Sequence, residues 1–305
     1  MQVPQSIWRW KLAFYLFLAG TGAGAYLAST VMDILGYAGP ARVGFAIAAP
    51  TVLVSTLFLI ADLGQPSRFM KAFVSPQHSW ISRGTLILTG FIILGLVHIG
   101  LAIWQFQALQ AQTLMVLKVV ASVFAAATAI YTGILIGVVV ARPFWNNAML
   151  PFLFLVSATS TGIGAVFLAG GVWFGLTGAA DAREVHGMLV GLSRMDLLLI
   201  GLESLILYFY LAIVSERSKE SVNLLLSGPM SGLFWGGFVV LGMVLPFILD
   251  WAGAYLTVGA ASLAIDAVSG VLLLIGGLFL RALILAAGLR SPIYVRVPVI
   301  VRPGA

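Results

Sequence analysis

A charged side chain inside a long apolar run is costly and is by default a functional candidate, and Asp196, Glu203 and Arg281 are such residues. Asp196 and Glu203 belong to one run and are two helical turns apart, so they share one face of a helix. Arg281 belongs to a later run, at a depth within about 5 Å of Glu203. Two interpretations stay open: a structural ion pair between two helices, or one step of a proton path that continues through Asp196, Glu184 and His186 to the opposite surface.

A long connection with polar and aromatic residues joins the second and third apolar runs. It extends over roughly 22 residues from Asp62 to Arg83, more than the packing of two helices requires, and it contains His78 and Trp80. One interpretation is an interfacial hairpin that aromatic and basic residues anchor at the level of the lipid headgroups. The functional interpretation is a loop that docks a partner and binds a ligand.

A second connection on the same side has the sequence ARPFWNNAMLP, from Ala141 to Pro151. Arg142 and Trp145 are typical of an interfacial anchor. Asn146 and Asn147 add hydrogen-bond donors that an anchor does not need.

The elements that must position these residues follow from the composition, which is 61% apolar and only 9% charged. The apolar residues form roughly eight uninterrupted stretches of a length that crosses a bilayer, and backbone in lipid must satisfy its own hydrogen bonds. We therefore predict an all-α polytopic membrane protein with eight transmembrane helices, the first retained rather than cleaved as a signal. The predicted spans are Leu12–Met32, Val43–Ala61, Gly84–Trp104, Leu114–Val140, Met149–Trp173, Gly187–Val214, Gly232–Leu249 and Leu263–Leu289.

Stripes of small residues occur in the first span, FLAGTGAGAYLAS, and in the fifth, FLFLVSATSTGIGAVFLAGG. A phosphate-binding loop would need a preceding strand and a soluble setting, so we interpret the stripes as sites of close helix packing. Their similarity is a weak indication of a parallel repeat. We predict one integral membrane domain, residues 1–305, arranged as two four-helix bundles with halves 1–147 and 148–305.

The residue types that bind iron–sulfur clusters and haem, cysteine and histidine, are missing or scarce in this sequence. The chain has no cysteine, so it holds neither an iron–sulfur cluster nor a thioether-linked haem, and it has only three histidines. A b-type haem needs axial ligands that face one another, whereas His98 lies in mid-span and His78 and His186 lie near opposite faces. We predict no haem and no cluster in this chain.

Several long motifs together resemble the NrfD/PsrC family, the membrane subunits of polysulfide, thiosulfate and related reductases. The resemblance extends over nearly the whole chain in order. The motifs are WRWKLAFYLFLAGTGAGAYLAS, DLGQPSRF, SWISRG, IYTGILIGVVVARPFWNNAMLPFLFLVSATSTG, the helix with Glu203, and LFLRALILAAGLRSP.

The resemblance implies a subunit without a metal cofactor that binds menaquinone or another quinone beside a ferredoxin-like iron–sulfur subunit. That partner connects in turn to a molybdopterin catalytic subunit. The predicted function is electron exchange between a quinol and the iron–sulfur partner in anaerobic-type respiration, with the protons leaving through side chains or water. The expected surroundings are the cell membrane and its lipid, with no nucleic acid.

The resemblance also implies where the quinone binds. The family's quinone-binding tyrosine matches Tyr131, and the positions of the accompanying Asn and His match Leu12 and Tyr15. Tyr15 can donate a hydrogen bond, but it does not accept a proton near neutral pH as histidine does. Other residues on the same side complete the predicted quinone-binding set: Asp62, His78, Trp80, Arg83 and Arg142.

Three questions stay open at this stage. Most lysines and arginines fall on the side of the termini, which by the positive-inside rule faces the cytoplasm, whereas the resemblance places that side outside. A secondary transporter would instead use Glu203, Arg281 and Asp196 as its site and would work without partners. A purely structural anchor would keep a vestigial quinone site, and Tyr131→Phe would then change nothing.

Overall fold

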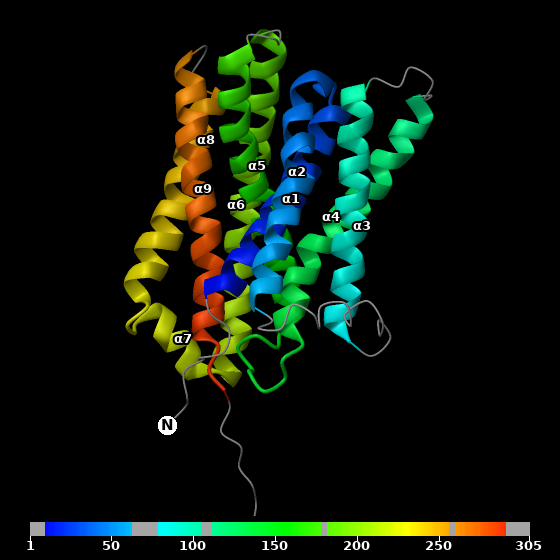
Figure 1. The fold of residues 1–305 in the computed structure, drawn as a ribbon. Coiled ribbons are helices and arrows are strands. Elements are labelled where there is room, and N and C mark those ends of the chain that lie inside the picture. The colour runs from blue at the N-terminus through cyan, green and yellow to red at the C-terminus, as the bar shows by residue number, and fades with distance from the viewer. Residues whose placement is uncertain (1–9, 63–78, 105–110, 178–181, 256–259, 291–305) are drawn as a thin grey trace, which may run out of the picture.

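The computed structural model describes residues 10–62, 79–104, 111–177, 182–255 and 260–290, and in these ranges the chain is almost entirely helical, without strands (Figure 1). Its elements, in order, are α1 (Trp10–Ile34), α2 (Ala38–Asp62), α3 (Trp80–Trp104), α4 (Ala111–Gly137), α5 (Met149–Thr177), α6 (Ala182–Arg217), α7 (Lys219–Leu226), the π-helix η2 (Leu233–Val244), α8 (Leu245–Tyr255) and α9 (Ala260–Ala287).

Within these ranges, eight helical segments are long and apolar enough to cross a membrane. This confirms the predicted all-α fold with eight spans. The seventh span combines η2 and α8 and continues to Tyr255, beyond the predicted end at Leu249, because the chain stays helical through Asp250. The hydropathy pattern did not predict α7, which is short and has one buried and one exposed face.

The spans stand side by side in a bundle with two ends (Figure 1). We call the end where α1 and α3 begin and α9 ends the lower end, and the end where α1 ends and α4, α6 and α9 begin the upper end. Helices α1–α4 form an N-terminal bundle, and α5, α6, η2 with α8, and α9 form a C-terminal bundle. Because α1 packs against α2 and α4 and also against α5 and α9, it connects the two bundles. This arrangement is compatible with the predicted pair of four-helix bundles.

Small residues allow α1 and α5 to approach one another at backbone contact. A Cβ atom added to Gly24 would overlap the backbone of Ala158, and one added to Gly162 would overlap the backbone of Gly24. Lipid-embedded helices gain packing contacts in this way without a hydrophobic driving force. The glycine stripes therefore serve helix packing.

Candidate functional site

Tyr15 and Tyr131 meet at the lower end of the N-terminal bundle. Tyr15 lies in the second turn of α1, Tyr131 lies near the end of α4, and their phenol groups interact electrostatically. Both are buried, with exposed fractions of 0% and 3%. The fold thus brings together the two tyrosines that the resemblance had selected.

The backbone of α3 closes this site at Gly84. A Cβ atom added to Gly84 would overlap the ring and the hydroxyl of Tyr131, so the phenol lies directly against the helix backbone. The Tyr15 hydroxyl is buried and has no hydrogen-bond partner in the described part of the chain. Since a buried hydroxyl usually finds a partner, an unpaired one fits a ligand that offers an oxygen.

The surroundings of the tyrosines are apolar. Leu12 and Leu16 are buried beside Tyr15 along α1, and Phe14 stacks on Phe58 of α2 with a centroid distance of 5.7 Å. Because both phenols are buried, a ligand would reach their hydroxyls only when neighbouring side chains move aside. The site fits an apolar ligand with a polar end.

Trp80 and Arg83 stand in the first turn of α3, directly before Gly84. The Arg83 guanidinium lies 4.6 Å from the centroid of the Trp80 ring, and both residues are exposed at the lower end. They precede, along α3, the glycine that contacts Tyr131, and their role at the site stays a prediction. His78 and the side chain of Asp62, which belong to the same predicted set, lie outside the described residues.

Arg142 contacts α9. Its guanidinium donates to the carbonyl of Gly288 and lies 4.8 Å from the ring of Trp145, whose Nε1 donates to the Ile284 carbonyl at 2.7 Å. Burial, and then repulsion from Arg290, lower the pKa of Arg142 from its ordinary value. These contacts fasten the α4–α5 connection to the end of α9, which favours an anchoring role for Arg142 over contact with a quinone.

The two asparagines of the same connection bond to helix ends. Asn146 Nδ2 donates to the carbonyl of Gly137 at 2.7 Å, where α4 ends. Asn147 Oδ1 accepts from the Met149 amide at 2.8 Å, where α5 begins. Their donors and acceptors satisfy backbone groups that helix ends leave unpaired.

Glu203 and Arg281 are buried between α5, α6 and α9, but they are not in direct ion-pair contact. Arg281 Nη1 donates to Ser157 Oγ at 3.0 Å and to the Gly277 carbonyl at 2.8 Å. Ser157 also forms a hydrogen bond with the Glu203 carboxyl, and that carboxyl interacts electrostatically with Arg281. A serine from α5, which depth along the sequence could not reveal, therefore bridges the two groups that we expected to pair directly.

Above this bridge, Asp196 of α6 belongs to a buried carboxyl cluster. Asp250 of α8 lies close to Asp196 and interacts with it electrostatically, and Ser269 Oγ donates to Asp250 Oδ1 at 2.6 Å. Asp266 of α9 interacts with Asp250, and all three carboxyls are 0–2% exposed. Asp250 and Asp266 were not selected from the sequence, although a carboxyl in or next to an apolar run was the available signal.

The two remaining residues of the predicted proton path lie near the start of α6, at the upper end. Glu184 Oε1 accepts from the Gly39 amide at 3.1 Å and so caps the start of α2. His186 is half-buried. Asp196, Asp250 and Asp266 thus lie between these residues and the Glu203–Ser157–Arg281 bridge.

The Glu203–Ser157–Arg281 bridge and the carboxyl cluster above it form one buried column in the C-terminal bundle. Arg281 connects this column to α1, the helix that carries Tyr15. Its guanidinium carbon lies 6.0 Å from the Phe17 ring, and its Nη2 lies only 3.0 Å from the position that a Cβ of Gly20 would occupy. Because Gly20 has no side chain, Arg281 reaches the surface of α1 one to two turns above Tyr15.

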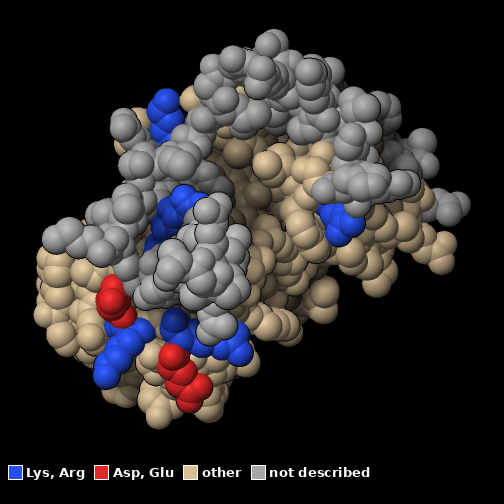
Figure 2. Space-filling model, turned by 90° about the horizontal axis from the view of Figure 1, so that it is seen from below, with Lys and Arg blue, Asp and Glu red and all other residues tan. Residues whose placement is uncertain are grey.

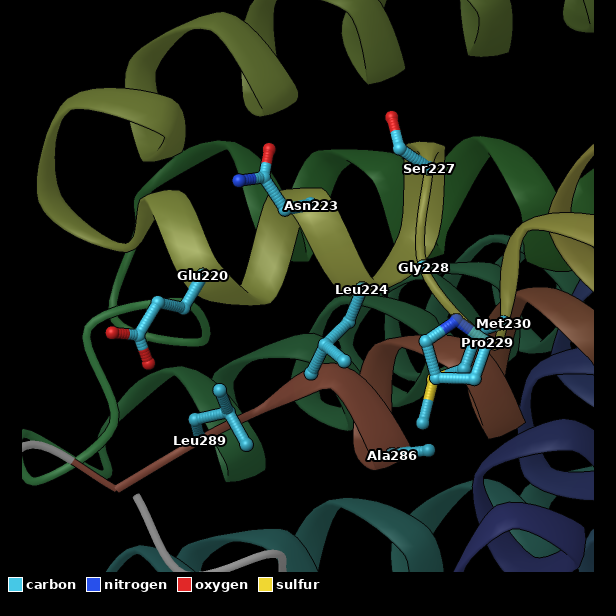
Figure 3. Close-up of a pocket in the computed structure, with 9 residues that line it drawn as sticks. All are labelled: Glu220, Asn223, Leu224, Ser227, Gly228, Pro229, Met230, Ala286 and Leu289. Atoms are coloured by element: carbon cyan, nitrogen blue, oxygen red, sulfur yellow. The ribbon is translucent and has the colours of Figure 1, made fainter. Parts of the chain in front are cut away.

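Figure 2, which views the lower end, shows basic and acidic side chains gathered on one side of it. Near the end of α6, the start of α7 and the residues after α9, the sequence has exposed Arg217, Lys219, Arg290, Glu216 and Glu220. A groove of about 800 Å³ opens beside α7 (Figure 3). It is lined by Glu220, Asn223, Leu224, Ser227, Gly228, Pro229, Met230, Ala286 and Leu289, none of which belongs to the tyrosine site.

Comparison of the sequence with known proteins identifies its family. Residues 1–292 match the family model described as "Polysulphide reductase, NrfD". The chain belongs to this family. It is 26% identical over 268 residues to a polysulfide reductase chain of Wolinella succinogenes, and the match spans 81% of this chain and 83% of the relative.

Two further relatives are similar over most of their length. The NrfD homolog of Haemophilus influenzae is 28% identical over 275 residues, a match that spans 81% of this chain and 84% of the relative. A selenate reductase subunit of Mesobacillus selenatarsenatis is 25% identical over 307 residues, which are 85% of this chain and 70% of the relative.

Family membership confirms the NrfD/PsrC resemblance and, with the eight spans, a multi-pass membrane subunit of the kind found in reductase complexes. The cell membrane is its expected location. Among the described residues, no group of three or more His, Cys, Asp or Glu side chains is placed to hold a metal ion.

Proposed function

We propose that this chain is the quinone-reactive membrane subunit of a molybdopterin oxidoreductase, exchanging electrons between menaquinol or a related quinol and an iron–sulfur partner subunit. The observation that carries the proposal is the pairing of two buried tyrosines in a chain of the polysulphide reductase family: Tyr131 lies against Gly84, and Tyr15, which interacts with Tyr131 electrostatically, has a buried, unpaired hydroxyl.

The two phenols suit both forms of a quinone headgroup. A tyrosine hydroxyl donates a hydrogen bond to a quinone carbonyl or accepts one from a quinol hydroxyl. The bound quinone supplies two-electron chemistry, and the protein supplies orientation and an apolar, water-poor setting. Trp80 and Arg83 at the rim of the site would contact the headgroup or the partner subunit, as would Asp62 and His78.

The iron–sulfur partner is expected at the lower end, since electrons leave a quinone only toward an acceptor close by. Exposed Arg217, Lys219 and Arg290 lie there together with Glu216 and Glu220, and such a charged surface suits a partner of complementary charge pattern. This docking role also offers a reason, other than membrane orientation, for the basic bias of the lower end.

The protons of the quinol would use the buried column of the C-terminal bundle. We assign Arg281 and Glu203 to its lower part and Asp196, with Asp250 and Asp266, to its upper part, where Glu184 and His186 lead to the surface. Buried carboxyls with unpaired oxygens are costly unless they are protonated or hydrated, which is the property that a proton path needs. One oxygen each of Glu203 and Asp266 has no hydrogen-bond partner among the described residues.

The test is tagged purification from the native membrane under gentle solubilisation, mass spectrometry of the companions, and quinol oxidation by the complex with Tyr131→Phe alongside. We expect a ferredoxin-like protein and a molybdopterin subunit to co-purify, and the variant to lose most of its quinol oxidation. Full activity of Tyr131→Phe would instead support the structural anchor.

Tyr210 provides a matched control for this experiment. It is as buried as Tyr15, but its hydroxyl donates to the Phe144 carbonyl at 2.5 Å and so has a structural partner. Tyr210→Phe should cost stability and leave quinol oxidation per folded complex unchanged.

The alternative function, a secondary transporter, would use the same buried column of Glu203, Arg281 and Asp196 as its substrate site. It predicts a protein that is purified without companions and shows no quinol chemistry. Recovery of such a lone, redox-inactive protein would replace the quinone proposal with this one.

A further inference from the structure

The N-terminal bundle contains a ladder of three polar pairs that neither the quinone site nor the column of the C-terminal bundle uses. At the upper end, Lys118 Nζ and Asp33 Oδ2 form an ion pair at 2.6 Å. One turn deeper, the hydroxyls of Thr30 and Ser122 are 3.0 Å apart. A further turn deeper, Tyr26 Oη bonds His98 Nδ1 at 2.9 Å.

The ladder follows from the periodicity of two helices. Asp33, Thr30 and Tyr26 are separated by three and four residues and therefore share one face of α1. Lys118 and Ser122 are four residues apart and share one face of α4. Along α1, the second rung is thus about 4.5 Å below the first, and the third is about 6 Å below the second.

Burial increases down the ladder. The side chains of Lys118 and Asp33 are 27% and 15% exposed, Thr30 and Ser122 are half-buried, and Tyr26 and His98 are 0% and 7% exposed. The Tyr26 and His98 rings also pack on Phe45, so the lowest rung is enclosed by aromatic rings. The polar line therefore begins at the upper surface and ends inside the bundle.

Helix packing alone does not require this composition. Neutral serine and threonine pairs are sufficient to tie membrane helices, whereas a lysine, an aspartate and a histidine on one line are costly in lipid and mark ion or proton routes by default. The line also combines a surface ion pair, hydroxyls and a terminal imidazole, the groups through which protons move.

We propose that the N-terminal bundle carries a hydrated proton-exchange path, which enters at the upper end past Asp33 and Lys118, follows Thr30 and Ser122, and ends at the His98–Tyr26 pair. The proposal concerns a site separate from the quinone site and does not depend on quinone binding. Water between the rungs would carry the proton, since hydroxyls one turn apart are too distant for direct transfer.

The terminal pair can take up and release a proton, and burial of the ring favours its neutral form between transfers. The His98 imidazole accepts a proton on a ring nitrogen and becomes a cation, while the Tyr26 hydroxyl stays hydrogen-bonded to Nδ1. The charged groups that act on His98 are Lys118 of α4, which opposes the cation, and Asp33 of α1, which favours it. The described part of α2 contributes the aromatic ring of Phe45 to this contact and no ionisable group.

The absence of cysteine from the sequence makes the path directly testable. Ser122→Cys would place one thiol on the second rung, in an otherwise thiol-free protein within its native complex in sealed vesicles. A membrane-impermeant methanethiosulfonate with a quaternary ammonium group would then be added to one side at a time. Thiolate formation needs water, so we expect labelling from the upper-end side about tenfold or more faster than at a lipid-facing site.

Val123→Cys is the matched control, because it is the next residue of α4, lies at the same depth and is 63% exposed on the outer surface of the bundle. Equal, slow labelling of the two thiols would overturn the proposal, as would labelling of Ser122→Cys from the lower-end side alone. Thiol labelling does not depend on quinol oxidation, so it fails or succeeds independently of the proposed function. Thr30→Cys, on the facing helix, repeats the test if Ser122→Cys does not assemble.

The unsubstituted protein provides a second readout. The C2 hydrogen of a histidine exchanges with deuterium over days only when water reaches the ring, and mass spectrometry resolves each histidine. We expect His98 to exchange in the wild-type complex, and more slowly in Lys118→Met, which removes the polar group at the entrance. A His98 ring that does not exchange in the wild type would refute the path.

Discussion

The substitution Gly84→Ala tests whether the position of the Tyr131 phenol in the candidate quinone site matters for function. The added methyl group would overlap the Cζ, Cε1 and hydroxyl oxygen of Tyr131, so the phenol ring or α3 must shift. Overlap with ring atoms on this scale requires a displacement on the order of 1 Å, and a misplacement of this size can lower the rate about 100-fold. Such a loss in kcat/KM for the quinol corresponds to about 2.7 kcal/mol.

The variant also strains the packing, so stability must be separated from function. Gly90→Ala is the control, because Gly90 lies on the same helix and a Cβ there would overlap the ring of Phe124, another aromatic residue of α4. Overpacking costs about 1–3 kcal/mol at either position. Both variants should therefore show similar falls in melting temperature, and only Gly84→Ala should lose quinol oxidation.

The assay has two parts. Quinol oxidation by the purified complex gives kcat and KM, and equilibrium binding of a soluble naphthoquinone to the protein in nanodiscs gives the affinity without turnover. The reasoning would be refuted if Gly84→Ala assembled with companions and oxidised quinol as the wild type does. It would be refuted equally if Gly90→Ala lost as much activity as Gly84→Ala at equal stability.

Three further predictions concern packing and buried charge. Arg281→Met leaves the carboxyl of Glu203 and the hydroxyl of Ser157 without their cation, so thermal unfolding in detergent should show a loss of about 3 kcal/mol, and an unchanged transition would contradict the bridge. Gly162→Leu should prevent the close approach of α1 and α5, and we expect no monodisperse protein on size exclusion; a normal elution profile would disprove that contact. Trp145→Phe removes the donor to α9 and should cost about 1 kcal/mol in chemical unfolding, with quinol oxidation per folded complex retained.

The spans could be predicted from the sequence because lipid imposes a length and a polarity on each helix. The same rule identified Glu203, Asp196 and Arg281 as buried charges. It did not identify Asp250, since the predicted span ended one residue before it, whereas the helix continues to Tyr255. A polar residue at the edge of an apolar run is hard to assign, because the run itself does not show where the helix ends.

Contacts between helices were harder to predict from the sequence than the helices themselves. The bridge through Ser157 and the pairing of Tyr26 with His98 depend on the rotation of each helix about its axis, which hydropathy does not determine. Likewise, the sequence marked Arg142 and Trp145 as interfacial residues but did not reveal that α9 lies beneath them. Tyr15 and Tyr131 were selected by resemblance to a family, and the structure supplies their electrostatic interaction and the contact of Tyr131 with Gly84.

Photoaffinity labelling tests the central claim most directly. An azido-naphthoquinone with a short isoprenoid tail would be irradiated with the protein in nanodiscs, with and without excess menaquinone, and the labelled peptides would be mapped by mass spectrometry. The account predicts competed labels in the second turn of α1, the start of α3 and the end of α4, around Tyr15, Gly84 and Tyr131. Competed labels confined to the column around Glu203 and Arg281, or no competed label at all, would contradict it.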